Sequence, residues 1–302
     1  GFDYVQFHDD DVAPADADFL ALQKHVATVK RILEGEGMQV EFIAPRLWTD
    51  PRTVDGPITS HRPEERQYAL ERSRRAIDIA NMLGTRNLVL WPAREGTYIR
   101  EAKDPVQASQ RMLEFLDALL DYDPHIRLLG EMKPNEPMDL MYWPTPGHFL
   151  AMSYRTKDPS RVGVLIETAH CILAGLDPSE EMAYALWHGK LWSVHLNDQN
   201  GLKFDEDKAF GSVNLRRAFN QVDVLVQNNY GANGEVVGFD VKAMRTQPEE
   251  IAYYHLRHSK EVFLLLVEVS ERLDRRQVEA LRQARDYESL EMLILRTLMG
   301  KE

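Results

Sequence analysis

The first place in the sequence that could carry chemistry is an apolar, strand-like segment that runs straight into a loop rich in oxygen ligands. It reads LWSVHLNDQNGLKFDEDKAFGS and covers residues 191–212. Side chains two positions apart in an extended strand share a face, so His195 and Asn197 should point together. Asp205 and Asp207 have the same spacing in the loop. An imidazole near two carboxylates can hold a divalent cation, although a solvated loop after a buried histidine would look similar.

Polar residues also follow other apolar segments. The residues are Glu131 and Lys133 in LLGEMKPNEP, Glu167 and His170 in VLIETAH, Asp240 and Lys242 in VVGFDVK, and His8 in YVQFHDDDVAP. Two tryptophans occupy comparable places, Trp48 after one strand-like segment and Trp91 at the end of another. Such aromatics are either core residues or walls for the apolar face of a sugar. The repeated pattern favours one shared metal site over chance.

Composition limits the classes of partner. The chain has 302 residues, is 44% hydrophobic and has no long apolar run, so we expect no membrane segment. The net charge of −12 argues against a nucleic-acid partner, because phosphate binding needs a basic surface. The single cysteine, Cys171, excludes an intrachain disulfide and fits a reducing, cytoplasmic location. The sequence starts GFDYVQF, without Met or a signal-like region, so we expect it to be trimmed at the N-terminus.

The elements that must position these residues are alternating strands and helices. Strand-like segments cover residues 4–8, 39–44, 87–92, 127–133, 162–167, 191–197 and 236–241, and helix-like segments cover 17–34, 65–83, 105–121, 145–155, 179–188, 214–228 and 248–270. Continuous apolar strands between helices are typical of a parallel sheet. Seven such units predict a TIM-type (β/α)8 barrel without its first β/α unit in this sequence. We expect residues 1–270 to form this barrel and 271–302 a charged helical tail, either solvated or packed as an arm on another subunit.

The order of the polar motifs resembles the xylose (glucose) isomerase family. The motifs are FHDDD, WPAREG, EMKPNEP, ETAH, HLNDQNGLKFDEDKAFG and GFDVKAMRT, across roughly residues 1–245. The resemblance implies interconversion of D-xylose and D-xylulose, or D-glucose and D-fructose, by ring opening and a 1,2-hydride shift. It also implies two divalent ions (Mg, Mn or Co) and a C-terminal arm that supports a homodimer or homotetramer.

The resemblance assigns roles to individual residues. The first metal site would comprise Glu131, Glu167, His195 and Asp240, and the second would comprise Glu167 as a bridge with His170, Asp205 and Asp207. His8, oriented by Asp11, would open the sugar ring, and Lys133 would hydrogen-bond the C1 oxygen. The residues expected to contact the sugar are Trp48, Trp91 and Glu136.

Two departures from the family leave other functions open. The family normally has Asp where this chain has His195, and a Glu, Glu, His, Asp set instead resembles the first site of rhamnose isomerase. The absent first unit would have supplied another aromatic side chain. An isomerase of another aldose, such as a 6-deoxyhexose, is therefore an alternative, as is a metal- and sugar-binding barrel with little turnover.

Two other enzyme classes explain the sequence less well. A one-metal ketose 3-epimerase would leave Asp205 and Asp207 unexplained. The acidic net charge argues against a metal-dependent abasic-site endonuclease, which must bind DNA.

Overall fold

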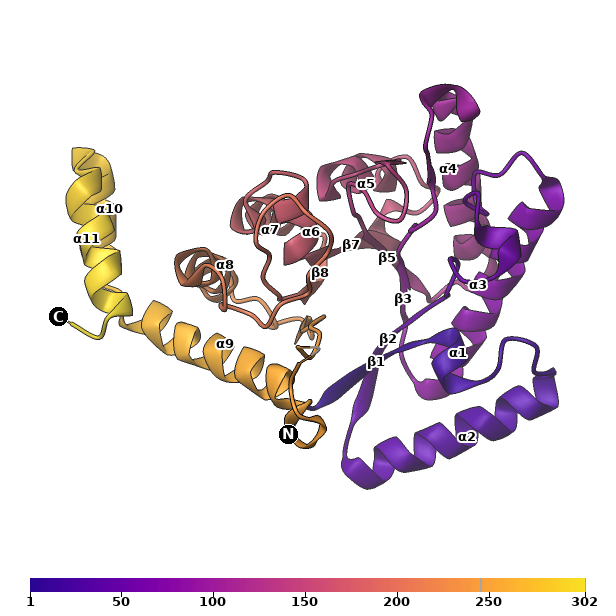
Figure 1. The fold of residues 1–302 in the computed structure, drawn as a ribbon, viewed down its shortest axis with the longest axis horizontal. Coiled ribbons are helices and arrows are strands. Elements are labelled where there is room, and N and C mark those ends of the chain that lie inside the picture. The colour runs from indigo at the N-terminus through magenta and orange to yellow at the C-terminus, as the bar shows by residue number, and fades with distance from the viewer. Residues whose placement is uncertain (245, 302) are drawn as a thin grey trace.

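Seven parallel strands form the sheet that carries the polar residues. The computed structural model describes residues 1–244 and 246–301, so Arg245 of the GFDVKAMRT motif and Glu302 of the predicted tail lie outside it. The strand order is β1-β2-β3-β5-β7-β8-β9 (Figure 1). The strands are β1 Tyr4–His8, β2 Gln39–Ala44, β3 Asn87–Leu90, β5 Arg127–Glu131, β7 Val162–Glu167, β8 Leu191–His195 and β9 Val236–Gly238. This arrangement confirms the predicted parallel α/β barrel.

Several predicted strands extended too far. The strands expected at 87–92, 127–133, 191–197 and 236–241 end at Leu90, Glu131, His195 and Gly238. The β5 and β8 strands end on the predicted ligands Glu131 and His195, β9 ends two residues before Asp240, and β3 ends directly before Trp91. A short antiparallel pair, β4 Gly96–Thr97 and β6 Leu140–Met141, was not predicted.

Helices cover the sheet close to their predicted positions. The main ones are α2 Phe19–Glu36, α3 Pro63–Leu83, α4 Pro105–Tyr122, α5 Pro146–Ser153, α7 Pro178–Trp187, α8 Leu215–Gln227 and α9 Tyr254–Arg272. Two short helices, α1 Asp9–Val12 and α6 Thr168–Leu173, begin directly at strand ends and were not predicted. The 3-10 turns are Pro51–Thr53, Arg100–Ala102, Pro159–Arg161 and Glu249–Ile251. The α3 helix stops before Gly84, because that glycine adopts the left-handed conformation with φ +86°.

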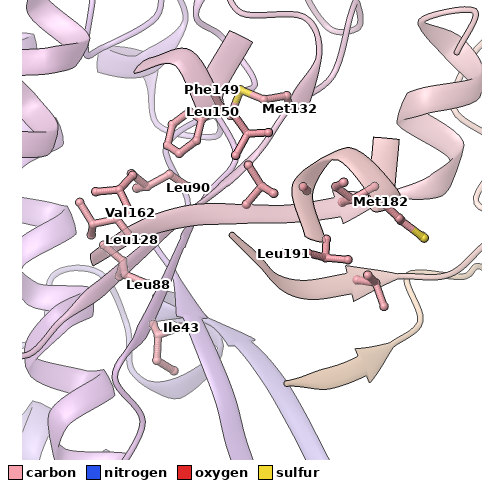
Figure 2. Close-up of a cluster of buried hydrophobic side chains, with 14 of the residues drawn as sticks. Ile43, Leu88, Leu90, Leu128, Met132, Phe149, Leu150, Val162, Met182 and Leu191 are labelled. Carbon is pink, nitrogen blue, oxygen red and sulfur yellow. The ribbon is translucent and has the colours of Figure 1, made fainter. Parts of the chain in front are cut away.

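Strand side chains alternate between two buried clusters. Ile43, Leu88 and Leu128 belong to the large cluster between the sheet and the helices (Figure 2). Phe42, Ala44, Val89, Leu129 and Leu165 form a second cluster on the opposite face, in the barrel interior. Burial on both faces explains why the strands read as continuous apolar runs.

The barrel is nearly closed. The edge strands β1 and β9 pair only with β2 and β8 among the described residues. Aromatic rings bridge the opening, because the ring centroid of Phe239 lies 6.4 Å from that of Phe2 and 6.4 Å from that of Phe263 on α9.

The predicted C-terminal tail is helical. The α10 helix (Arg275–Ala284) and the α11 helix (Tyr287–Leu298) lie side by side at the far end of α9, away from the sheet (Figure 1). The α9 helix runs through the predicted domain boundary at residue 270, and both that boundary and a subunit contact through the tail stay predictions. No helix in the described ranges combines the length and the apolar character needed to cross a membrane.

Candidate metal centre

The four residues predicted for the first site come together at the carboxyl ends of neighbouring strands. Glu131 ends β5, Glu167 ends β7, His195 ends β8, and Asp240 follows β9. Nδ1 of His195 lies 3.8 Å from Oε2 of Glu131 and 4.0 Å from Oε2 of Glu167. Glu167, His195 and Asp240 each offer a ligand atom within 4.8 Å of the others. The parallel sheet therefore gathers groups that are far apart in the sequence.

The residues predicted for the second site share Glu167 with the first. Glu167, Asp205 and Asp207 also offer ligand atoms within 4.8 Å of one another. His170 enters from α6, and its Nε2 lies 3.3 Å from Oε1 of Glu167 and 3.2 Å from Oδ2 of Asp205. All seven predicted ligands thus belong to one continuous cluster centred on Glu167.

Unpaired polar atoms in this cluster fit a bound cation. Within the described part of the chain, Nδ1 of His170, Nδ1 of His195 and Oδ1 of Asp205 are buried without a hydrogen-bond partner. Leaving such atoms unpaired is costly, and nearly all buried polar groups in proteins have a partner. Carboxylate oxygens with one or two imidazoles are a donor set that suits Mg, Mn or Co. The residues present therefore fit divalent ions.

The shifted pKa values of the carboxylates in the cluster also fit a bound cation. Burial raises the pKa values of Glu131 and Glu167 well above the usual range, and the neighbouring carboxylates raise them further. Burial and the adjacent Asp205 raise the pKa of Asp207 to about 7. Burial alone would also raise the pKa of Asp205, but the hydrogen bond and charge of His170 and the charge of Lys133 hold it well below its usual value. Without a cation, part of the cluster holds protons at neutral pH.

Two lysines compensate the charge of the second site. Nζ of Lys133 lies 2.9 Å from Oδ2 of Asp205 and 3.2 Å from Oε2 of Glu136, and Lys242 pairs with Asp207. By contrast, no described Lys or Arg nitrogen lies within 4.0 Å of the Glu131, Glu167 or Asp240 carboxylates. The greater uncompensated negative charge is therefore in the first site.

The predicted sugar-contacting residues form a row beside the cluster. Ring centroids lie 5.2 Å apart for His8 and Trp48 and 4.6 Å apart for Trp48 and Trp91. Nζ of Lys133 lies 5.5 Å from the centre of the Trp91 ring. The row thus leads from the predicted ring-opening histidine to the second metal site.

The surroundings of His8 include a residue that was not predicted. Nδ1 of His8 lies 3.1 Å from Oδ2 of Asp11, in line with the predicted pair, and 3.0 Å from Nη2 of Arg46. Burial and the charge of Arg46 lower the pKa of His8, against the opposing effect of Asp11. The imidazole is therefore kept neutral around pH 7. Arg46 lies two residues after the end of β2, the same offset as Lys133 after β5, so its position after a strand end was a signal that could have indicated it.

Asn197 has a role that the sequence only hinted at. The strand spacing placed it beside His195, and in the structure its Nδ2 donates to Oε1 of Glu167 at 2.8 Å and to the backbone oxygen of Asp240 at 3.0 Å. Asn197 therefore ties the shared ligand of both sites to the segment after β9.

Comparisons with known proteins agree with this fold. The family described as xylose isomerase-like TIM barrel matches residues 1–229. A D-tagatose 3-epimerase-like protein is 18% identical, with a TM-score of 0.69, and the match covers 89% of this chain and 90% of that one. An L-ribulose 3-epimerase is 17% identical, with a TM-score of 0.64 and coverage of 93% and 88%. A 3-keto-D-glucoside 4-epimerase from E. coli is 14% identical, with a TM-score of 0.66 and coverage of 86% and 90%.

At such low identities the solved structures establish a common fold, and the family match covers most of the chain. The family-level resemblance drawn from the motifs is confirmed, whereas the narrower likeness to xylose isomerase itself and the rhamnose-isomerase-like role of His195 stay predictions. The chain belongs to the xylose isomerase-like TIM-barrel family.

Proposed function

We propose that the protein is a divalent-metal-dependent isomerase that interconverts an aldose and its ketose, with D-xylose and D-glucose as the first substrates to test. The observation that carries this proposal is the position of Lys133. Its ammonium group is buried between the Asp205 carboxylate, at 2.9 Å, and the ring of Trp91, at 5.5 Å. A fixed positive charge beside a metal site opposes metal binding, but in addition to its ion pair with Asp205 it can stabilise a substrate oxygen that becomes negative during the reaction.

The residues divide the work between ring opening and hydrogen transfer. Neutral His8 would move a proton from the anomeric hydroxyl to the ring oxygen as the bond between C1 and that oxygen breaks. Lys133 would then donate a hydrogen bond to the C1 oxygen while the hydrogen at C2 moves with its electron pair to C1. The C2 hydroxyl would lose its proton as the C2 carbonyl forms, and that proton would pass to the C1 oxygen. Divalent ions held by the two sites would supply positive charge to the sugar oxygens. Trp48 and Trp91 would pack against the apolar face of the sugar and exclude water.

A second candidate is 3-epimerisation of a ketose with a single ion. It is favoured by the charge distribution, because Lys133 and Lys242 already compensate Asp205 and Asp207. Under this alternative only the first site, with Glu131, Glu167, His195 and Asp240, would bind an ion tightly. Paired carboxylates would then exchange the proton at C3 instead of guiding a hydrogen from C2 to C1.

One experiment separates the candidates. The purified protein with Mn²⁺ is incubated in D2O with xylose, glucose, rhamnose, ribose, fructose or ribulose, and the products are followed by NMR. An aldose–ketose isomerase working by hydrogen transfer should give the ketose without solvent deuterium at C1, whereas an epimerase should give a C3 epimer that carries deuterium. Glu167→Gln, which changes the ligand shared by both sites, is the inactive control.

Sugar binding measured by calorimetry on the same preparation tests the remaining alternative. Binding without turnover would identify a metal- and sugar-binding barrel. If no sugar in the panel is bound or converted, the proposed function is wrong.

A further inference from the structure

A row of buried and half-buried polar side chains crosses the barrel interior and ends on His195. Oε1 of Gln6, on β1, lies 2.9 Å from Nε2 of His195, on β8. Nε2 of Gln6 donates to Oε2 of Glu41, on β2, at 2.6 Å. The other oxygen of Glu41 accepts from the Ser193 hydroxyl at 2.5 Å. The row therefore links β1 and β2, at one edge of the sheet, to a predicted metal ligand on β8.

The donor and acceptor chemistry of this row permits one orientation. Burial raises the pKa of Glu41, and the hydrogen bonds from Gln6 and Ser193 oppose this rise. An ionised carboxylate only accepts hydrogen bonds, so with Glu41 ionised the amide NH2 group of Gln6 must face it. The amide oxygen of Gln6 then faces His195 and, because it too only accepts, Nε2 of His195 must carry the hydrogen. The lone pair is left on Nδ1. That atom is buried without a partner in the described chain and faces Glu131 and Glu167, at 3.8 and 4.0 Å.

The backbone is shaped to make room for the row. The pairing of β1 with β2 shifts between Val5↔Val40 and Gln6↔Phe42, so Glu41 is the extra residue of a β-bulge. Strict alternation would have placed Glu41 on the opposite face from Phe42, yet its carboxylate reaches both Gln6 and Ser193. At Gly238, a Cβ atom would lie 2.6 Å from Nε2 of Gln6 and 3.2 Å from Cδ2 of His195. Glycine there leaves the space that the amide and the imidazole occupy.

We propose that Gln6, held by Glu41, is a positioning residue that fixes His195 as the Nε2–H tautomer and presents its Nδ1 atom to a divalent ion. This inference rests on the proposed metal site. It adds Gln6 on β1 and Glu41 on β2 to that site, as residues that support a ligand without contacting the ion. Hydrogen bonds to the second nitrogen of a ligating histidine have this effect in other metal sites.

The test uses Gln6→Met, which replaces the amide with a thioether that is only a weak acceptor, and Glu41→Gln, which keeps the shape but lets the two amides reverse. Thr85→Val is the matched control, because the Thr85 hydroxyl donates to the backbone oxygen of Glu41 and not to its carboxylate. Nitrogen-15 NMR of labelled histidines, assigned with a His195→Gln variant, reports the tautomer in metal-free protein. Calorimetry with Mn²⁺ reports affinity, and circular dichroism checks folding.

We expect the Nε2–H tautomer in the wild type and in Thr85→Val. In Gln6→Met and Glu41→Gln the Nδ1–H form should appear, and Mn²⁺ should bind roughly 10- to 100-fold more weakly. If Gln6→Met does not fold, Glu41→Gln gives the same comparison. Wild-type tautomer and affinity in a folded variant, or an Nδ1–H wild type, would overturn the positioning role. A wild type that binds no Mn²⁺ would instead overturn the proposed function, and the tautomer measurement would still report on Gln6.

Discussion

The Lys133 ammonium nitrogen lies 2.9 Å from Oδ2 of Asp205, so a permanent positive charge borders a cluster built mostly from carboxylates. Burial would lower the pKa of Lys133, but Asp205 and Glu136 raise it above its usual value. The side chain is therefore charged throughout the neutral pH range. It also has 4% relative exposure, which leaves little freedom to move away from the site.

Replacing Lys133 should separate catalysis from metal binding. We expect Lys133→Met to reduce kcat by about 10²-fold or more, the usual effect of removing one group that stabilises developing charge. Mn²⁺ affinity should stay equal or increase, because a competing cation has gone. Steady-state kinetics and calorimetry measure the two effects.

The control for this change is Lys242→Met. Lys242 pairs with Asp207, but its side chain is 62% exposed. If the role of Lys133 were only to neutralise an aspartate, both variants would lose activity to a similar degree. If Lys133 instead contacts the substrate directly, Lys242→Met should lose much less activity than Lys133→Met.

Metal removal should destabilise the fold. An ion at a hundredfold excess over its Kd contributes about 2.7 kcal/mol to the free energy of unfolding. For a chain of this size we expect the melting temperature to fall by roughly 5 °C when EDTA replaces Mn²⁺. Thermal melts followed by circular dichroism test this expectation, and Glu167→Gln should abolish the difference. Coincident wild-type curves would contradict the metal assignment.

Metal uptake should depend on pH through Asp207. Its pKa is raised to about 7, so below that pH the ion must displace a proton, and Mn²⁺ affinity should weaken from pH 8 to pH 6. Calorimetry in buffers of different ionisation enthalpy should detect protons released on binding. Equal heats in all buffers at pH 7 would argue against Asp207 as a ligand.

The stability of the metal-free protein should have the opposite pH trend. The raised pKa values of Glu131, Glu167 and Asp207 mean that the folded state holds protons that the unfolded state has lost. Stability from these groups is present at low pH and is lost as pH rises through their folded pKa values. Through Asp207, whose folded pKa is about 7, chemical denaturation of the metal-free protein should become easier as pH rises towards 7.

His195→Asp should change the metal preference. A carboxylate makes the first site more negative and richer in oxygen, which favours Mg²⁺ relative to Mn²⁺ or Co²⁺. It should also reduce proton competition in mild acid, because an imidazole ligates only when neutral. Activity titrations with Mg²⁺ and Mn²⁺ at pH 6 and pH 8 compare the two proteins. His195→Asn separates charge from shape, and identical profiles for the wild type and His195→Asp would exclude His195 as a ligand.

The sequence by itself predicted the barrel and the clustering of the candidate metal ligands. Apolar strands alternating with helices predict a parallel sheet, and in such a sheet the carboxyl ends of all strands face the same side. This rule was enough to bring together residues as distant as Glu131 and Asp240 without any knowledge of their contacts. It worked because the strand pattern and the polar residues at or just after several strand ends are local features of the sequence.

Only the tertiary structure decided how these groups are held. Gln6 and His195 are 189 residues apart, and Glu41 reaches them because a bulge breaks the two-residue alternation that sequence reasoning assumes. Arg46 contacts His8, and Lys242 pairs with Asp207. Both residues lie in loops after strands, and the paths of these loops depend on packing. The α6 helix, which delivers His170, is too short for a periodic signal. Strand order can be read from local patterns, but the partner of each buried polar atom depends on distances that exist only after the chain has folded.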